Sequence, residues 1–202
     1  MSSLFFTADQ HFGHENIIKF CNRPFKNTDE MTEELIKRHN NKVPKGARVY
    51  HVGDMFWRTI SPKRAMEILH ELNGQHYFIW GNHDETMEEI VARKYPTNVT
   101  NLIWAKDLAL VNKEDNHPRI TLCHYSMQVW PGSHRGDWHL FGHSHGQLKG
   151  IGKSFDVGVD THNYEPWSIE EVIVKMSTLE VFGDKRQKSG KTDWEELSKG
   201  IK

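Results

Sequence analysis

YFIWGNHD, residues 77–84, begins with four apolar side chains and ends with three consecutive polar ones. A short apolar run that stops at a glycine, here Gly81, predicts a buried strand followed by a sharp change of direction. In an open α/β sheet, ligands bind beyond the carboxyl ends of the strands. We therefore expect Asn82, His83 and Asp84 to lie at a functional site.

The same pattern, an apolar run followed directly by polar side chains, occurs twice more in the first half of the chain. Residues 3–8 lead into Asp9 and His11, and residues 47–52 lead into Asp54. Segments with apolar residues at helical spacing separate these runs. Alternating strands and helices are typical of an α/β fold with parallel strands, whose carboxyl ends share one edge.

From residue 98 onward this alternation stops. Short β-like runs follow one another with turn residues and no helix-length insert, which predicts a second sheet built of hairpins. Ser168 is the predicted N-cap of a last core helix. The sequence therefore predicts one domain over residues 1–176 and a charged tail over residues 177–202, with a short peripheral helix at 192–199.

The composition excludes several classes of protein. A formal net charge of -1 over 202 residues gives no general attraction for nucleic acid or anionic lipid. No apolar run reaches the ~20 residues that span a membrane. The chain has only two cysteines and no signal peptide, so we expect reduced thiols and a cytoplasmic location.

The polar residues at the predicted strand ends form a set that is typical of a catalytic metal site. Such sets of carboxylates, imidazoles and an amide oxygen suit Mn²⁺, Fe or Zn²⁺, whereas structural zinc usually recruits cysteine. Any one of these residues alone is more often a turn or cap residue, so the interpretation depends on the whole set. Its members are Asp9, His11, Asp54, Asn82, His83, His124, His143 and His145.

Five motifs, in this order, resemble those of the calcineurin-like metallophosphoesterases, especially small bacterial or phage-type members. They are Asp9-x-His11, Gly53-Asp54, Gly81-Asn82-His83-Asp84, His124 and Gly142-His143-x-His145. The resemblance spans residues 4 to about 174. It implies a two-sheet β-sandwich flanked by helices, in four layers α/β/β/α. It also implies two divalent metal ions per chain, with Mn²⁺ expected first and Fe²⁺ or Zn²⁺ as alternatives.

The resemblance further implies a role for each residue of the set. The two ions would share Asp54, and a hydroxide that bridges them would attack phosphorus. His83 would face the leaving group as a general acid or electrostatic stabiliser. The ligands would be Asp9, His11, Asp54 and His145 for one ion, and Asp54, Asn82, His124 and His143 for the other.

Residues 55–58, Met-Phe-Trp-Arg, depart from the protein phosphatase pattern, in which Gly-Asp continues with x-x-Asp-Arg. Arg58 matches the arginine that grips phosphate and is the second candidate catalytic residue. Trp57, however, replaces the aspartate that would orient His83, which leaves open whether Asp84 or a backbone carbonyl does so. An indole also adds a stacking surface, which favours a phosphodiesterase with a nucleotide-like substrate.

Three more basic residues, with Trp57, are candidate substrate contacts: Arg23, Lys26 and Arg135. Such charges are more often solvated. Two other enzymes, a phosphomonoesterase or a nuclease, and a non-enzymatic metal-binding interaction module remain alternatives. The complete ligand set argues against the module, and the neutral net charge argues against a nuclease that tracks long nucleic acids. We expect a small phosphate ester or a nucleotide as substrate and no membrane partner. The sequence predicts no oligomeric state.

Overall fold

Two β-sheets form the centre of the protein in a computed structural model that describes residues 3–92, 102–105, 108–114 and 116–181. The predicted helix at 192–199 lies outside these residues. The first sheet has the order β4-β3-β2-β1-β9, in which the first four strands are parallel and β9 is antiparallel. Its strands are β1 (Leu4–Thr7), β2 (Arg48–Val52), β3 (Gln75–Ile79), β4 (Leu102–Ala105) and β9 (Trp167–Ser168).

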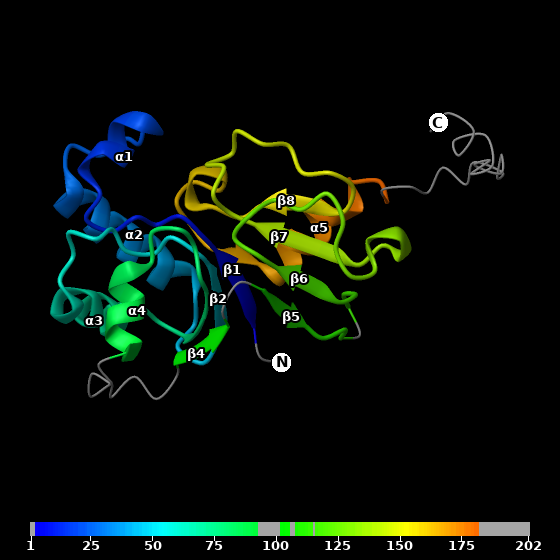
Figure 1. The fold of residues 1–202 in the computed structure, drawn as a ribbon, viewed down its shortest axis with the longest axis horizontal. Helices are drawn as coiled ribbons and strands as arrows, with labels where there is room; N and C mark the ends of the chain where they lie inside the picture. The colour runs from blue at the N-terminus through cyan, green and yellow to red at the C-terminus, as the bar shows by residue number, and fades with distance from the viewer. Residues whose placement is uncertain (1–2, 93–101, 106–107, 115, 182–202) are drawn as a thin grey trace, which may run out of the picture.

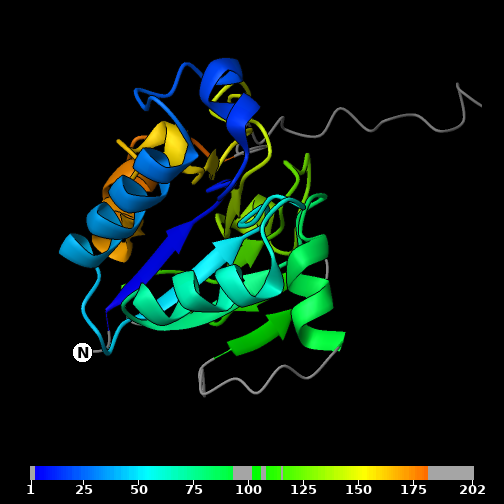
Figure 2. The same ribbon diagram turned by 90° about the vertical axis from the view of Figure 1, so that its left-hand side faces the viewer.

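Helices cover the outer side of the first sheet. Four of them lie together on the left of Figure 1, and Figure 2 shows helices in front of the strands when this side faces the viewer. No helix of the described residues is long and apolar enough to cross a bilayer. The helices are α1 (Glu15–Phe20), α2 (Thr28–Lys42), α3 (Pro62–Glu71), α4 (Glu85–Ala92) and α5 (Ile169–Ser177).

The N-cap predicted for the last helix is confirmed. The Ser168 hydroxyl accepts a hydrogen bond from the backbone N–H of Glu171, whose carboxylate accepts one in return from the Ser168 N–H. This capping box satisfies two backbone donors at the start of α5. It fixes the point at which the chain leaves the sheet edge at β9 and enters the helix.

The second sheet, with the order β5-β6-β7-β8, is not built of hairpins, and that prediction is wrong. Only β5 and β6 are antiparallel, whereas β6, β7 and β8 are parallel. The long connections over residues 123–137 and 142–153 let the chain return without a helix, so parallel pairing becomes possible. The strands are β5 (Ala109–Val111), β6 (Ile120–Leu122), β7 (Trp138–Phe141) and β8 (Ser154–Asp156), with the 3-10 turns η1 (Ser133–Arg135) and η2 (Val159–Thr161).

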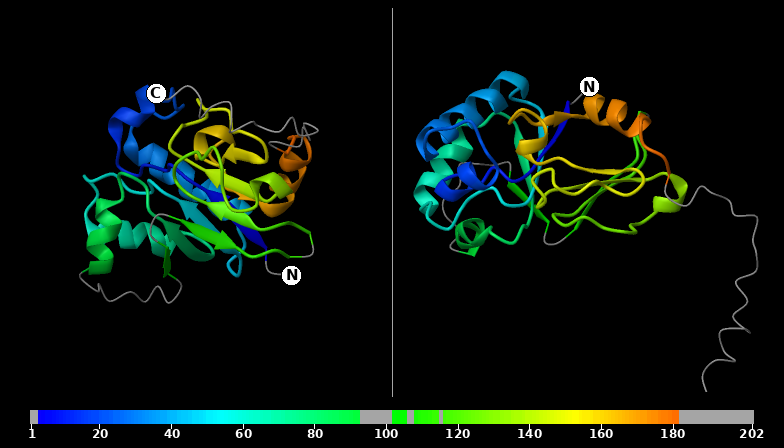
Figure 3. Two further views of the ribbon diagram at one scale, coloured as in Figure 1. Left: turned by 45° about the vertical axis from the view of Figure 1, so that its right-hand side comes forward. Right: turned by 90° about the horizontal axis from the view of Figure 1, so that it is seen from above.

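The two sheets pack face to face, and the first sheet is buried on both sides. Leu4 and Phe6 of β1 pack toward the second sheet, where Leu140 of β7 meets them, and α5 contributes Val172 to the same core. Figure 3 shows the helices α1–α4 and the second sheet on opposite sides of the first. All four residues of β1 are buried, so the polar residues that follow this strand lie where its covered part ends. The structure is thus a mixed α/β fold of two sheets flanked by helices.

Three buried histidines lie between the first sheet and its helices. His76 Nε2 donates to the carbonyl of Leu72, so its Nδ1 accepts from His51 Nε2 at 2.9 Å. His51 Nδ1 then accepts from the amide of Gln10. His39 Nε2 lies 2.8 Å from a backbone carbonyl and donates to it. Each ring therefore has a defined partner in its neutral form.

Because these histidines are buried in their neutral form, we expect the protein to lose stability in acid. Burial lowers the pKa of His39 and of His76 to about 4, and holds that of His51 well below its ordinary value. The unfolded chain takes up these protons below about pH 6.5. Stability is therefore complete above that pH and is lost as the pH falls toward 4, by about 1.4 kcal/mol per pH unit for each histidine.

The replacement His39→Gln keeps an N–H donor but cannot be protonated. Urea unfolding should show a pH dependence of stability about 1.4 kcal/mol per pH unit shallower than in the wild type between about pH 6 and pH 4.5, and no difference in slope above about pH 7. His70 on α3 is exposed, so His70→Gln serves as the matched control and should keep the wild-type slope. Equal slopes in His39→Gln and the wild type would show that His39 is not buried in its neutral form.

Candidate metal centre

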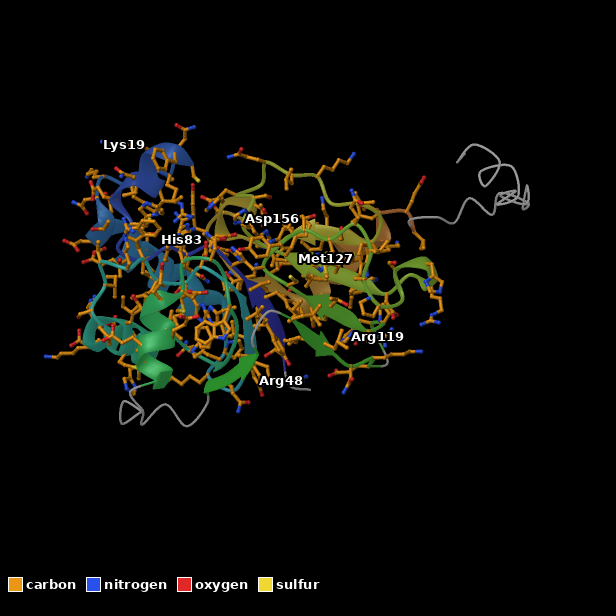
Figure 4. The ribbon with its side chains drawn as sticks, in the orientation of Figure 1. Lys19, Arg48, His83, Arg119, Met127 and Asp156 are labelled. Atoms are coloured by element: carbon orange, nitrogen blue, oxygen red, sulfur yellow. The ribbon has the colours of Figure 1, made fainter. Side chains whose placement is uncertain are left out.

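Five parallel strands, three from the first sheet and two from the second, end at one edge of the molecule. The polar residues predicted at strand ends follow β1, β2, β3, β6 and β7, and all of them meet there. Figure 4 shows His83 and Asp156 along this edge, whereas Arg48, at the start of β2, lies at the other end of the strands. The shared strand direction therefore brings residues together that are up to 136 positions apart, from Asp9 to His145.

The first group of candidate ligands is Asp9, His11 and His145. Their ligand atoms lie within 4.8 Å of one another, and the rings of His11 and His145 are 5.2 Å apart. Asp9 is fully buried, and both of its oxygens accept the backbone N–H of His143, at 2.9 and 3.0 Å. The loop after β7 is thus tied directly to the loop after β1.

The second group is Asp54, His124 and His143, whose ligand atoms also lie within 4.8 Å of one another. The side-chain oxygen of Asn82 is 3.1 Å from Nε2 of His124 and joins this group. Asp54 Oδ2 lies 3.4 Å from His124 Nε2 and 3.6 Å from His11 Nε2. Asp54 therefore stands between the two groups, where a shared ligand would have to be.

Hydrogen bonds fix the tautomers of two candidate ligands. His124 Nδ1 donates to the carbonyl of Val52 at 2.9 Å, and His145 Nδ1 donates to the carboxylate of Asp160 at 2.7 Å. In the neutral form of each ring, Nε2 is therefore the nitrogen whose lone pair can bind a metal in its group. Metal-binding histidines usually have such a partner on the other nitrogen.

The buried donor atoms fit a divalent cation. His11 is buried, and neither of its ring nitrogens has a hydrogen-bond partner. Burial lowers the pKa of His11 to about 2, which keeps the ring in the neutral form that metals bind, and raises the pKa of Asp9 to about 7. A cation between them would satisfy the histidine lone pair and stabilise the carboxylate charge.

Asp54 and His124 stabilise each other's charged forms, whereas burial favours the neutral forms of Asp9 and His11. Burial alone would raise the pKa of Asp54, but its contact with His124 holds it at about 2. Burial alone would lower the pKa of His124, but the same contact raises it to about 9. Asp54 is therefore ionised, and an ion bound at this group would displace the proton of His124, because imidazole binds metals in its neutral form.

The backbone at these residues is strained. Eight non-glycine residues of the described chain have a positive φ, and five of them are candidate ligands. Such conformations cost roughly 1–3 kcal/mol each and concentrate at functional sites. The five are Asp9 (60°), His11 (52°), Asp54 (58°), His143 (67°) and His145 (48°).

Two glycines allow the loops to approach one another closely. A Cβ atom at Gly81 would overlap the carboxylate and backbone of Asp54, and one at Gly142 would meet a carboxylate oxygen of Asp9 at 2.7 Å. Neither glycine has a positive φ. Their role is therefore to leave room for the aspartates.

Asp84 braces the backbone and does not orient His83. Its carboxylate accepts hydrogen bonds from the N–H groups of Asp54 (2.8 Å), Met55 (3.0 Å) and Gly81 (2.8 Å). The backbone N–H of His83 donates to Asp54 at 2.9 Å, and its ring lies 4.6 Å from the ring of Trp57. Within the described chain the His83 imidazole itself has no hydrogen bond. Ring packing against Trp57 replaces the carboxylate support.

A hollow of about 450 Å³ opens above the first group. It is lined by candidate ligands, by His83 and by Trp57. Arg58 does not line it: this exposed residue places its guanidinium carbon 5.3 Å from the centre of the Trp57 ring. Arg58 therefore lies at the rim, behind the indole, and the structure does not bring it among the candidate ligands.

The hypothesis that Arg23 contacts substrate does not agree with its environment. The side chain is buried and binds both oxygens of Asp160, at 2.8 and 2.7 Å. It also donates to the backbone carbonyls of Gln10 (2.8 Å) and Asp9 (2.7 Å). These contacts go to the backbone of Asp9, to the residue between Asp9 and His11, and to the carboxylate that holds the His145 ring, so Arg23 positions the first group from behind.

A third set of possible ligand atoms, from Cys21, His145 and Asp160, also lies within 4.8 Å. The guanidinium of Arg23 already occupies the Asp160 carboxylate there. A second positive charge next to it would be repelled, so this set does not fit a cation.

Lys26 and Arg135, the other two basic residues predicted to contact substrate, do not reach the hollow. Both are exposed, and neither lines it. Lys26 lies before α2, where its backbone N–H donates to Glu30. Arg135 belongs to η1, in the yellow-green turn at the opposite end of the molecule from α1–α4 in Figure 1. Neither residue is brought together with the candidate ligands.

Sequence reasoning missed the residues that hold the loop of His143 and His145. Asp156 accepts hydrogen bonds from Ser144 Oγ (2.5 Å) and from the N–H groups of Gly146 (2.9 Å) and Gly158 (2.7 Å). Asp156 is the last residue of β8, so its position at the end of a β-like run was the signal that could have found it. Tyr125, which is 49 % exposed and packs against the His143 ring at 4.9 Å, gave no sequence signal beyond following His124.

Fold and site together define an α/β protein whose strand ends carry two groups of residues able to hold a metal ion. The chain belongs to the same family as the uncharacterized protein MJ1445 of Methanocaldococcus jannaschii, to which it is 33% identical over 183 residues, 87% of this chain and 92% of that protein. The crystal structure of a protein of unknown function, AQ665 from Aquifex aeolicus, has a similar fold. It gives a TM-score of 0.65 at 21% identity, over 85% of this chain and 98% of that one. No family model matches the chain.

Proposed function

We propose that the protein is a metal-dependent phosphoesterase of the calcineurin-like type, and that it hydrolyses a phosphodiester in a nucleotide-like substrate. The observation that carries the proposal is the convergence of seven candidate ligands into two groups on either side of Asp54. Two groups sharing one carboxylate suit a pair of divalent ions, for which we propose Mn²⁺ first.

The bound ions would supply Lewis acidity and a nucleophile at neutral pH. The residues of the chain have the remaining tasks. His83, whose ring lies 5.8 Å from that of His11 and makes no hydrogen bond within the described chain, would give a proton to the leaving oxygen. Asp84 keeps the loops after β2 and β3 in register, so that His83 and Asp54 stay together.

The charge of the hollow favours a diester over a monoester. Among the residues that the structure describes, neither a lysine nor an arginine lines it. A phosphomonoester carries about -1.5 to -2 charges at pH 7, because its second pKa is near 6, whereas a diester carries one. A site that relies on the bound ions alone for positive charge therefore suits the singly charged diester.

The test compares two chromogenic esters. With Mn²⁺, we expect the protein to hydrolyse bis-p-nitrophenyl phosphate with a kcat/KM at least about tenfold above that for p-nitrophenyl phosphate, and a chelator should abolish both reactions. Asn82→Ala removes an amide oxygen from the second group and should lower kcat/KM by about 10- to 100-fold.

The exposed residue His134 in η1 provides the control, since His134→Ala should behave as the wild type. Hydrolysis of neither ester by the metal-loaded protein would overturn the proposal, and if long nucleic acids were not hydrolysed either, the metal-binding interaction module would remain. A preference for the monoester would instead point to a phosphomonoesterase, and hydrolysis only of long nucleic acids would point to a nuclease.

A further inference from the structure

One wall of the hollow consists of aromatic residues that belong to neither group of candidate ligands. It comes from α1, the loop before it and the loop after β2, and includes His14, Phe20 and Trp57. We call these three residues the aromatic shelf. In Figure 4, Lys19 marks α1 above His83, on the outer side of the strand ends. The shelf thus extends from the candidate ligands toward the surface.

Two rings of the shelf form a rigid stack. The rings of His14 and Trp57 are parallel to within 2°, with centroids 3.7 Å apart. His14 is only 9 % exposed, and its Nδ1 is buried without a hydrogen-bond partner. The ring of Phe20 meets His14 edge-on at 6.5 Å. A second aromatic contact joins Trp57 to His83, at 4.6 Å, so the shelf begins beside the proposed proton donor.

Packing of α1 against the core does not explain why a phenylalanine occupies position 20. The helix α1 is anchored to the core by Ile17 and Ile18, which are buried, whereas Phe20 is 71 % exposed. An exposed ring at the border of a pocket is available to a ligand. Nucleobases stack on such rings because every base has a flat π-face.

We propose that the aromatic shelf binds a nucleobase of the substrate, while the phosphate of the same molecule lies at the metal groups. This rests on the proposed function. The hollow, about 450 Å³, falls within the roughly 300–1,000 Å³ of small-molecule pockets. Asn16 and Gln147 line the same hollow, and their amides can donate to and accept from the edge of a base. Stacking holds the base, and the two amides read its edge.

The first experiment measures binding, which does not depend on hydrolysis. Calorimetry with Mn²⁺-loaded protein compares adenosine 5′-monophosphate with ribose 5-phosphate, which has the same phosphate and sugar but no base. We expect the nucleotide to bind at least about tenfold more tightly, which corresponds to about 1.4 kcal/mol. In Phe20→Ala this ratio should fall below about threefold.

The matched control is Val174→Ala, which removes an exposed apolar side chain from α5 and should leave the ratio unchanged. Two variants of His14 separate stacking from hydrogen bonding. His14→Phe keeps a flat ring against Trp57 and should retain at least half of the base preference, whereas His14→Ala should lose most of it. Urea unfolding of each variant identifies any that fails to fold. Phe20→Ala is the decisive variant, because its side chain is exposed and its removal should not affect folding.

The outcomes distinguish this inference from the proposed function. Equal affinities of the wild type for the two ligands, or an unchanged ratio in a folded Phe20→Ala variant, would overturn the role of the shelf even if the protein hydrolyses diesters. Conversely, a base preference that depends on Phe20, without hydrolysis of any ester, would support the shelf and refute the phosphoesterase. Hydrolysis together with the expected ratios would support both.

Discussion

Asp54→Asn is expected to remove at least one of the two divalent ions proposed for the site and to lower the proposed hydrolysis of a diaryl phosphodiester by about a thousandfold or more in kcat/KM. Asp54 Oδ2 lies 3.6 Å from His11 Nε2 and 3.4 Å from His124 Nε2, between the two groups. Asparagine has the same shape and can still accept the N–H of His83 through Oδ1. It lacks the charge that a shared ligand needs to hold two cations together, and a loss of about 4 kcal/mol corresponds to that factor.

Metal content per chain, measured by mass spectrometry after dialysis, tests this independently of activity. Asp137→Asn is the control, because Asp137 pairs with Arg119 away from the site and its loss should leave metal content unchanged. An Asp54→Asn protein that keeps two ions and the wild-type rate would show that Asp54 does not bridge them. Retained metal with lost activity would place the effect on catalysis alone.

Arg23→Met is expected to destabilise the metal-free protein by about 3–5 kcal/mol. The change leaves the buried carboxylate of Asp160 without its guanidinium partner, and the backbone carbonyls of Asp9 and Gln10 without the donor they have here. Asp160 also holds the His145 ring, so metal affinity of the first group should fall by about 10- to 100-fold.

Urea unfolding of metal-free protein and titration with Mn²⁺ measure the two effects of Arg23→Met. Arg64→Met provides the comparison, because Arg64 pairs only with Glu67 and Glu71 at the surface among the described residues and its loss should cost less than about 1 kcal/mol. If Arg23 contacted substrate instead, Arg23→Met would raise KM and leave stability and metal affinity intact. That result would contradict the positioning role assigned from its hydrogen bonds.

Much of the site could be predicted because its residues share a local pattern. Asp9, Asp54 and His143 each come directly after an apolar run, and strand ends of parallel strands meet at one edge. Motifs that are far apart in the sequence become neighbours in space because the strands that precede them run in the same direction. The parallel second sheet contributed to this, although the sequence predicted hairpins there.

The roles of Arg23, Asp84 and Arg58 could not be predicted in the same way. Each depends on which partner a side chain finds in space: Arg23 binds Asp160, 137 positions along the chain. A charge next to a predicted site looks the same in sequence whether it is buried against a carboxylate or exposed at the rim. Asp84 shows the same difficulty, because its three donors are backbone groups with no sequence signature.

By itself, the sequence determined which chemical groups follow each strand and in what order, since an apolar run and the polar residues after it are neighbours in the chain. Only the tertiary structure decided how these groups divide around Asp54, which carboxylates support the histidines, and that α1 adds an aromatic wall. The physical reason is that hydrogen bonds and ring contacts depend on distances of a few ångströms between loops. Those distances are set by the packing of two sheets and their helices.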